Sequence, residues 1–160
     1  MHPLQHRSAS LRILPLLALF TTALTGCPMA ADCFPNATVH VTLDSAVDAP
    51  PGTPLVITSV SRIYDSDITG TDERGLPVGR AMDRNVGGFG RTVDIVRNQR
   101  SYTATISVDP YPTYYFAFVD LDRDGWPDPG EPLGVDPENP VDSGCDEPTR
   151  AITIKPAGAR

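Results

Sequence analysis

Hydrophobic and polar residues alternate along several segments after residue 36, and this period of two is typical of β-strands with one buried face. Residues 37–43 place two valines and a leucine on one face, with two threonines and His40 on the other. Residues 102–108 alternate in the same way, with Tyr, Ala, Ile and Val on one side and Thr and Ser opposite. We therefore predict a half-buried strand in each segment.

Other segments predict further strands and no helix. Residues 55–60 and 114–119 are apolar almost throughout, as expected of strands inside a sheet. The weaker strand candidates are residues 76–82, 91–96 and 149–155. Prolines interrupt the chain so often that no segment of helical period reaches a useful length. The predicted fold class is therefore all-β, a single antiparallel β-sandwich of about seven strands. Residues 121–148 are expected to form one long loop, and loops of this length are usually functional or ordered by a metal.

The N-terminal segment has the pattern of an export signal. A basic start is followed by an apolar run of about 14 residues, which is short for a membrane span of roughly 20 residues. The run ends in Leu24-Thr25-Gly26-Cys27, which resembles the lipobox of bacterial lipoproteins. In that family the chain is cut before the cysteine, which then carries the lipid, palmitate included.

The lipobox resemblance implies three parts of the chain. Residues 1–26 would be the signal peptide, residues 27–36 the lipid anchor on Cys27 with a short linker, and residues 37–156 the β-sandwich domain. The alternative is ordinary secretory cleavage after residue 30 or 31, which would remove Cys27. Both alternatives predict export from the cytoplasm.

Two cysteines remain once Cys27 is assigned to the lipid, and an even pair in an exported protein indicates a disulfide. Cys33 and Cys145 each precede a predicted strand, the first and the last of the domain. We predict a bridge between them, which suits two terminal strands that lie parallel and adjacent. The alternative is two free thiols.

Residues 120–131 match the calcium-loop pattern D-x-[DN]-x-[DN]-G-x5-E at every specified position. Carboxylates at loop positions 1, 3 and 5 converge when the chain coils around a cation, and Gly125 at position 6 permits the sharp turn. Oxygen ligands without His or Cys favour Ca²⁺ over zinc or copper, and Mg²⁺ demands a more rigid octahedral site. The expected ligands are the carboxylates of Asp120, Asp122, Asp124, Asp128 and Glu131 and the main-chain carbonyl of Trp126. The alternative is an acidic surface turn that binds no metal.

The loop resembles that of EF-hand proteins, but its flanks do not. Residues 113–119 have the aromatic and β-branched composition of a strand where a helix should lead in. Pro129, Pro132 and Pro137 exclude a helix immediately afterwards. The sequence therefore predicts a single calcium site between strands, and a paired helix-loop-helix sensor is not expected.

The transition from a late aromatic strand into this loop also resembles a feature of a known protein family. Residues 114–119 lead directly into Asp120, and the loop ends in Asp128-Pro-Gly-Glu-Pro-Leu-Gly134. This arrangement is similar to the prealbumin-like (transthyretin-like) β-sandwich modules of bacterial envelope proteins, over roughly residues 37–155. An Ig-like sandwich also fits the strand pattern. The prealbumin resemblance implies a structural calcium site on a domain used for display or binding.

Charge excludes some classes of partner. All 20 acidic residues follow Cys27, against 11 basic ones, and residues 109–147 hold 11 acidic side chains with Arg123 as their single basic one. This excess disfavours nucleic acid and anionic lipid headgroups as partners.

His40 is the one histidine after the predicted signal peptide. We expect it to be exposed and not a catalytic base, so the residues needed for a Ser-His-Asp or Cys-His centre are not available.

The expected function is that of a non-catalytic lipoprotein of the bacterial cell envelope, anchored to the membrane by lipid. Structural calcium would support adhesion, assembly or ligand display, with a protein or glycan of the envelope as partner. The alternative is a small envelope hydrolase that uses carboxylates of the acidic loop, since paired carboxylates suffice for glycoside hydrolysis.

Overall fold

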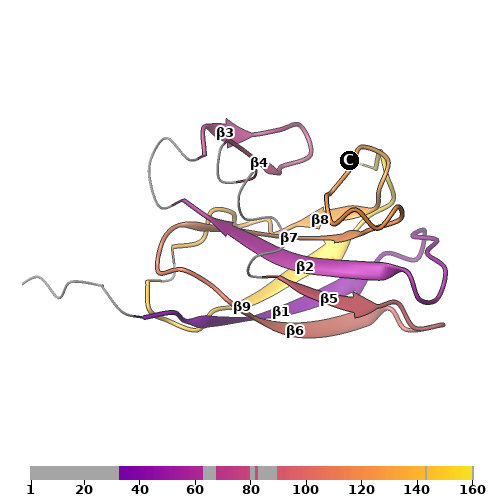
Figure 1. Cartoon of the computed structure of the whole chain (residues 1–160), viewed down its shortest axis with the longest axis horizontal. Coiled ribbons are helices and arrows are strands. Elements are labelled where there is room, and N and C mark those ends of the chain that lie inside the picture. Colours follow the sequence, from indigo (N-terminus) through magenta and orange to yellow (C-terminus); the bar gives the residue numbers. More distant parts are fainter. Residues whose placement is uncertain (1–32, 63–67, 80–81, 83–89, 143, 160) are drawn as a thin grey trace, which may run out of the picture.

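Two facing β-sheets and a small hairpin make up the fold in a computed structural model (Figure 1), which describes residues 33–62, 68–79, 82, 90–142 and 144–159. Within these residues the sheets have three, four and two strands, and pairing is antiparallel except between the first and last strands. The all-β prediction is confirmed, and the open, packed sheets fit a β-sandwich.

The three-stranded sheet has the order β6-β1-β9, formed by β6 (Ser101–Ser107), β1 (Asn36–Leu43) and β9 (Thr149–Ile154). Buried and exposed residues alternate along β1 and β6 as their sequences predict, and the buried set faces the interior. Strand β1 pairs antiparallel with β6 and parallel with β9. The expectation that the terminal strands lie parallel and adjacent is confirmed.

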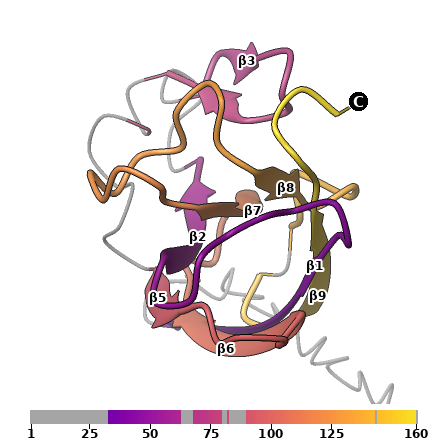
Figure 2. The ribbon, with the colours of Figure 1, turned by 90° about the vertical axis from the view of Figure 1, so that its right-hand side faces the viewer.

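The four-stranded sheet has the order β5-β2-β7-β8, formed by β5 (Arg91–Asp94), β2 (Pro54–Ser61), β7 (Thr113–Val119) and β8 (Leu133–Val135). Strands β2 and β7 are its two inner strands, as their apolar sequences predict, and every residue of β7 is buried. One face of β2 and β7 meets the three-stranded sheet. Their other face is covered by the hairpin of β3 (Gly70–Thr71) and β4 (Pro77–Val78), which lies outside the sandwich in Figure 2.

The hairpin explains why β7 is apolar on both faces. Tyr115 and Ala117 belong to the core between the two sheets, whereas Phe116 and Phe118 belong to a second apolar cluster. The two phenylalanine rings stack with centroids 6.5 Å apart, and the hairpin residue Leu76 lies in the same cluster. Full burial of such side chains stabilises the fold by about 1.5–3 kcal/mol each.

A disulfide joins Cys33 to Cys145, as predicted, with the two Cα atoms 5.8 Å apart. The bridge lies at the end of the sandwich where β1 and β9 begin, and it closes a loop of 112 residues. A cross-link over a loop of this length stabilises the folded chain by about 4–5 kcal/mol in the chain-entropy model. The first and last strands are therefore tied together covalently as well as by their hydrogen bonds.

The prediction of one uninterrupted loop over residues 121–148 is wrong, because β8 lies within it. This three-residue strand pairs with β7 and packs so closely on β9 that a Cβ at Gly134 would lie 2.5 Å from the carbonyl oxygen of Thr153. A side chain at residue 134 would therefore clash. The predicted strand 76–82 is confirmed only at Pro77–Val78, and residues 80 and 81 lie outside the described part.

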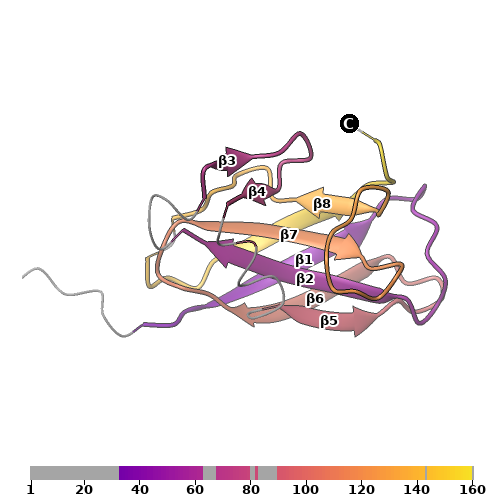
Figure 3. The ribbon, with the colours of Figure 1, turned by 45° about the horizontal axis from the view of Figure 1, so that its top comes forward.

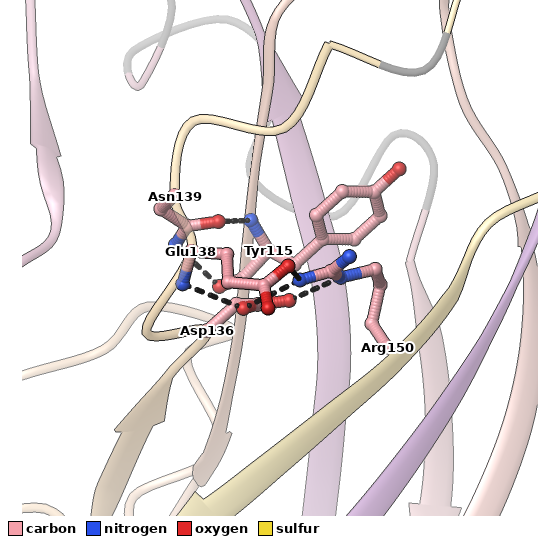
Figure 4. Close-up of polar contacts among 5 residues, drawn as sticks. All are labelled: Tyr115, Asp136, Glu138, Asn139 and Arg150. Atoms are coloured by element: carbon pink, nitrogen blue, oxygen red, sulfur yellow. Dashed lines mark hydrogen bonds and ion pairs between the residues drawn. The ribbon is translucent and has the colours of Figure 1, made fainter.

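A partly buried polar cluster fixes the chain that follows β8 (Figure 4). The Asp136 carboxylate accepts hydrogen bonds from Arg150 Nε at 2.5 Å and Nη2 at 2.9 Å, and Glu138 accepts one from Nη2 at 2.6 Å. The Asn139 side-chain amide forms two hydrogen bonds with the main chain of Tyr115. It accepts one from the Tyr115 N–H and donates one to the Tyr115 carbonyl, both at 2.8 Å. Hydrogen bonding to Asp136, with a smaller contribution from Glu138, raises the pKa of Arg150 despite its burial. This cluster therefore joins the segment after β8 to β7 and β9.

Candidate metal-binding loop

Residues 120–131 lie at the end of the sandwich where β1 ends and β2 begins, visible in Figure 3 as the loop that follows β7. The Asp120 N–H donates to the carbonyl of Pro54 at 3.0 Å, and Arg123 Nη2 donates to the carbonyl of Gly52 at 3.1 Å. Strand β1 has eight residues, so this end lies about 25 Å from the end with the disulfide. The acidic loop and the bridge are therefore at opposite ends of the sandwich.

Asp120 begins the loop and is its most buried carboxylate, at 4% exposure. Its Oδ1 accepts the N–H of Arg123 at 2.7 Å, and its Oδ2 accepts the N–H of Gly125 at 3.2 Å. Both donors have left-handed backbones, with φ of 68° at Arg123 and 83° at Gly125. Glycine tolerates this conformation without strain, and the coil that it permits wraps the main chain around the Asp120 carboxylate.

Asp122 and Asp124 continue the coil from exposed positions. Asp122 Oδ1 accepts the N–H of Asp124 at 3.3 Å, and Asp124 Oδ1 accepts the N–H of Trp126 at 2.7 Å. One carboxylate oxygen each from Asp120, Asp122 and Asp124 lie within 4.8 Å of one another. The structure thus brings together three of the six ligands proposed from the sequence.

Glu131 spans the two ends of the loop. Its Oε1 accepts the N–H of Leu121 at 2.5 Å, and its Oε2 accepts the N–H of Asp128 at 3.1 Å. At 8% exposure, burial raises the pKa of Glu131, the two hydrogen bonds oppose this change, and the charges of Asp120 and Asp122 add to it. The Glu131 carboxylate therefore closes the coil and lies near enough to Asp120 and Asp122 for their negative charges to raise its pKa.

The other two proposed ligands are the Trp126 carbonyl and the Asp128 carboxylate. The Trp126 carbonyl accepts the N–H of Asp128 at 3.1 Å, and the Asp128 side chain is exposed. The carboxylates of Asp128 and Glu131 do not belong to the group formed by the three aspartates. These two carboxylates would have to approach the three aspartates for a full set of six ligands to form.

Two arginine side chains link the loop to its surroundings without an ion pair to its carboxylates among the described residues: Arg74 of the hairpin, and Arg123, which belongs to the loop itself. Arg74 of the β3–β4 hairpin donates from Nη1 to the carbonyl of Pro127 at 2.8 Å and pairs through Nε with Asp72 at 3.0 Å. Arg123 reaches the carbonyl of Gly52. Among the described residues, no ion pair involves a carboxylate of the loop. The loop is therefore held by main-chain carbonyls, and its negative charge has no partner in the described chain.

The sequence indicated the loop but not the hairpin that supports it. Asp72 Oδ1 accepts the N–H groups of Arg74 at 2.8 Å and Leu76 at 2.9 Å, and Gly75 has a φ of 84°. The segment Asp72-Glu-Arg-Gly75 is a turn signal that would have predicted this hairpin. The hydrogen bond from Arg74 to Pro127, 53 residues away, could not be predicted from the spacing of residues in the sequence.

His40 lies on the exposed outer face of β1, where its Nδ1 is 2.9 Å from Thr103 Oγ1. This placement agrees with the expected exposed histidine. It lies on the face of the three-stranded sheet and not in the loop that holds the carboxylates.

Residues 1–32 lie outside the described part of the structure, so the signal peptide, Cys27 and the two alternative cleavage positions remain predictions. None of the described residues forms a helix with the length and hydrophobicity needed to span a membrane. Comparison of the chain with models of known families, with curated proteins and with solved structures finds no match.

Proposed function

We propose that this protein is a non-catalytic lipoprotein of the bacterial cell envelope, a prealbumin-like β-sandwich whose acidic loop is ordered by one Ca²⁺. Cys27 carries the lipid anchor, and the domain serves adhesion, assembly or ligand display. The proposal joins the lipobox, the strand-to-loop arrangement and the geometry of residues 120–131.

The observation that carries the calcium proposal is the unbalanced charge of Asp120. A carboxylate at 4% exposure needs a compensating charge, because burial of an unpaired ion is costly. Asp120 has two main-chain N–H donors and two aspartates as neighbours, and no ion pair among the described residues. A divalent cation would supply the charge that the chain does not.

The residues that would hold the ion are Asp120, Asp122, Asp124, Asp128, Glu131 and the carbonyl of Trp126. All are oxygen donors, which is the set that Ca²⁺ prefers. The N–H groups that already bond to these carboxylates orient them and leave further lone pairs for the ion. Bound calcium would hold the loop in its coil.

Calorimetry of the full-length protein in a non-ionic detergent tests this proposal. Wild type should bind one Ca²⁺ with a Kd of about 10⁻⁴–10⁻³ M, the range of extracellular modules. Glu131→Gln should weaken binding by about tenfold or more, because it removes the carboxylate that closes the loop. Glu147→Gln, an exposed acidic residue outside the loop, is the matched control and should bind as wild type does. The calcium proposal is wrong if wild type gives no heat at millimolar Ca²⁺.

A second experiment tests the anchor. Only residues 28–32 separate Cys27 from Cys33, and such a tether spans at most about 20 Å. It would hold the disulfide end close to the bilayer and direct the acidic loop away from it. Cys27→Ser should release the protein from the membrane fraction or leave it as an uncleaved precursor. Normal processing and membrane partitioning of Cys27→Ser would instead support ordinary secretion.

A further inference from the structure

A groove of about 290 Å³ runs between the β3–β4 hairpin and the acidic loop. Leu76, Val78 and Met82 line it from the hairpin side, and Trp126, Pro127 and Asp128 line it from the loop. The hydrogen bond from Arg74 to the Pro127 carbonyl holds the two walls together. Two segments about 50 residues apart in the sequence thus form one concave, largely apolar surface.

Two of the large hydrophobic side chains in this groove are exposed. Val78 is 46% exposed and Trp126 is 39% exposed, one from each wall. Their exposure costs free energy that burial against a partner would recover. Tryptophan is also the residue type most enriched among those that dominate binding at protein interfaces.

The charge around the groove indicates what kind of partner fits. Asp72 and Arg74 neutralise each other, and Asp128 is the remaining charge in the lining, with no ion pair among the described residues. Asp122 and Asp124 are exposed in the same loop. A bound Ca²⁺ would offset only two of the five negative charges in the loop. The surface beside Trp126 is therefore complementary to a cation, and a lysine or arginine can also stack on the indole face.

We propose that this groove docks an apolar polypeptide segment that carries lysine or arginine, contributed by a partner protein of the envelope. The apolar side chain fills the space between Val78 and Trp126, and the basic side chain meets the carboxylates of the loop. The inference rests on the proposed role as a binding module and specifies the chemistry of its partner. The groove lies at a distance from the disulfide end of the domain. If Cys27 is the anchor, the disulfide end is the one close to the membrane, and the groove is accessible to such a segment.

The position of Trp126 couples peptide docking to calcium binding. The Trp126 carbonyl is a proposed ligand, whereas the Trp126 side chain lines the groove. A cation that orders residues 120–131 would fix the position of the indole, so calcium should strengthen docking. Trp126 is the single tryptophan of the chain, and its fluorescence reports on this site alone.

A labelled peptide tests the docking proposal. The probe is a fluorescein-labelled peptide Gly-Lys-Pro-Leu-Lys-Gly, measured by anisotropy against full-length protein in a non-ionic detergent with saturating Ca²⁺. One relative has glutamate in place of both lysines, and another has serine in place of the leucine. We expect the parent peptide to bind at least about tenfold more tightly than either relative, with affinity falling as salt rises.

Two variants localise the binding. Trp126→Ala keeps the main-chain carbonyl and should weaken the parent peptide by about tenfold or more, as loss of an interface tryptophan does. Tyr111→Ala is the matched control, because Tyr111 is also an exposed aromatic residue but precedes β7 at the other end. Equal binding by Trp126→Ala and wild type overturns the proposal. Equal binding of all three peptides, or displacement of the parent peptide by neutral dextran, also overturns it.

Calorimetric titration of Ca²⁺ into calcium-free protein from the same preparation, without EDTA, separates this inference from the proposed function. Calcium binding without peptide binding overturns the docking proposal and leaves the calcium site intact. Peptide binding that persists in EDTA supports docking, while the absence of calcium heat in the calcium-free protein counts against the calcium proposal alone.

Discussion

Asp120 and Asp136 are two buried aspartates in matching positions whose charges are balanced in different ways. Each follows directly after a strand of the same sheet, Asp120 after β7 and Asp136 after β8, and they are 4% and 2% exposed. Each also accepts a hydrogen bond from a main-chain N–H a few residues ahead. Asp136 has the guanidinium of Arg150, whereas Asp120 has other carboxylates as its charged neighbours.

The difference shows how to tell a structural carboxylate from a candidate ligand. Burial and main-chain hydrogen bonds are common to both sites and do not distinguish them. A cationic side chain beside the carboxylate does distinguish them, because a buried carboxylate that is already paired has little charge left for a metal ion. Arg74 of the hairpin and Arg123 of the loop itself strengthen this contrast, since each links the loop to its surroundings through a main-chain carbonyl and neither forms an ion pair with a loop carboxylate.

The largest expected effect comes from removal of the cation at Asp136. Arg150→Met should lower the free energy of unfolding by about 3–5 kcal/mol, because the Asp136 side chain is 1% exposed and would keep an uncompensated charge. Urea denaturation monitored by circular dichroism measures this loss. Glu138→Gln is the control, and it should have a much smaller effect because Glu138 is largely exposed. If Arg150→Met unfolds at the same urea concentration as wild type, the ion pair does not stabilise the fold.

A smaller effect is expected at Asp120, where calcium would play the part of Arg150. Saturation at a hundred times the Kd should stabilise wild type by about 2.7 kcal/mol through mass action. Asp120→Asn should lose most of this increment, as measured by thermal unfolding with and without Ca²⁺. Arg150→Met should keep the full increment, because distant sites contribute additively. An increment of the same size in Asp120→Asn would show that Asp120 is not a ligand.

The sequence predicted those parts of the fold in which the pattern is local. Alternation in β1 and β6 identified their buried faces, and continuous apolar sequence identified β2 and β7 as inner strands. The cysteine positions predicted the parallel pairing of β1 with β9, because a covalent bridge reports a contact between distant residues. The loop motif also pointed to Asp120, Asp122 and Asp124, and the structure places one carboxylate oxygen of each within 4.8 Å of the other two.

The missed features depend on contacts between distant segments. Strand β8 is three residues long and lies among Pro, Gly and Asp, so its composition reads as loop. Its pairing is fixed by β7 and by close packing on β9 at Gly134, which no local pattern records. Arg150 lies 14 residues after Asp136, and the groove joins segments about 50 residues apart. These partners were brought together by the sheets and not by their spacing in the chain.

The bridge between Cys33 and Cys145 also determines how the domain would bear a mechanical load. Tension between a lipid on Cys27 and a partner at the far end would enter the fold at Cys33. Because Cys33 is bonded to Cys145, the pull would divide between β1 and β9 at the ends where both begin. Strand β1 could not then slide out alone, because the tied pair would have to move together against its neighbours. Reduction of the bridge would leave β1 alone to bear the load at that end of the domain.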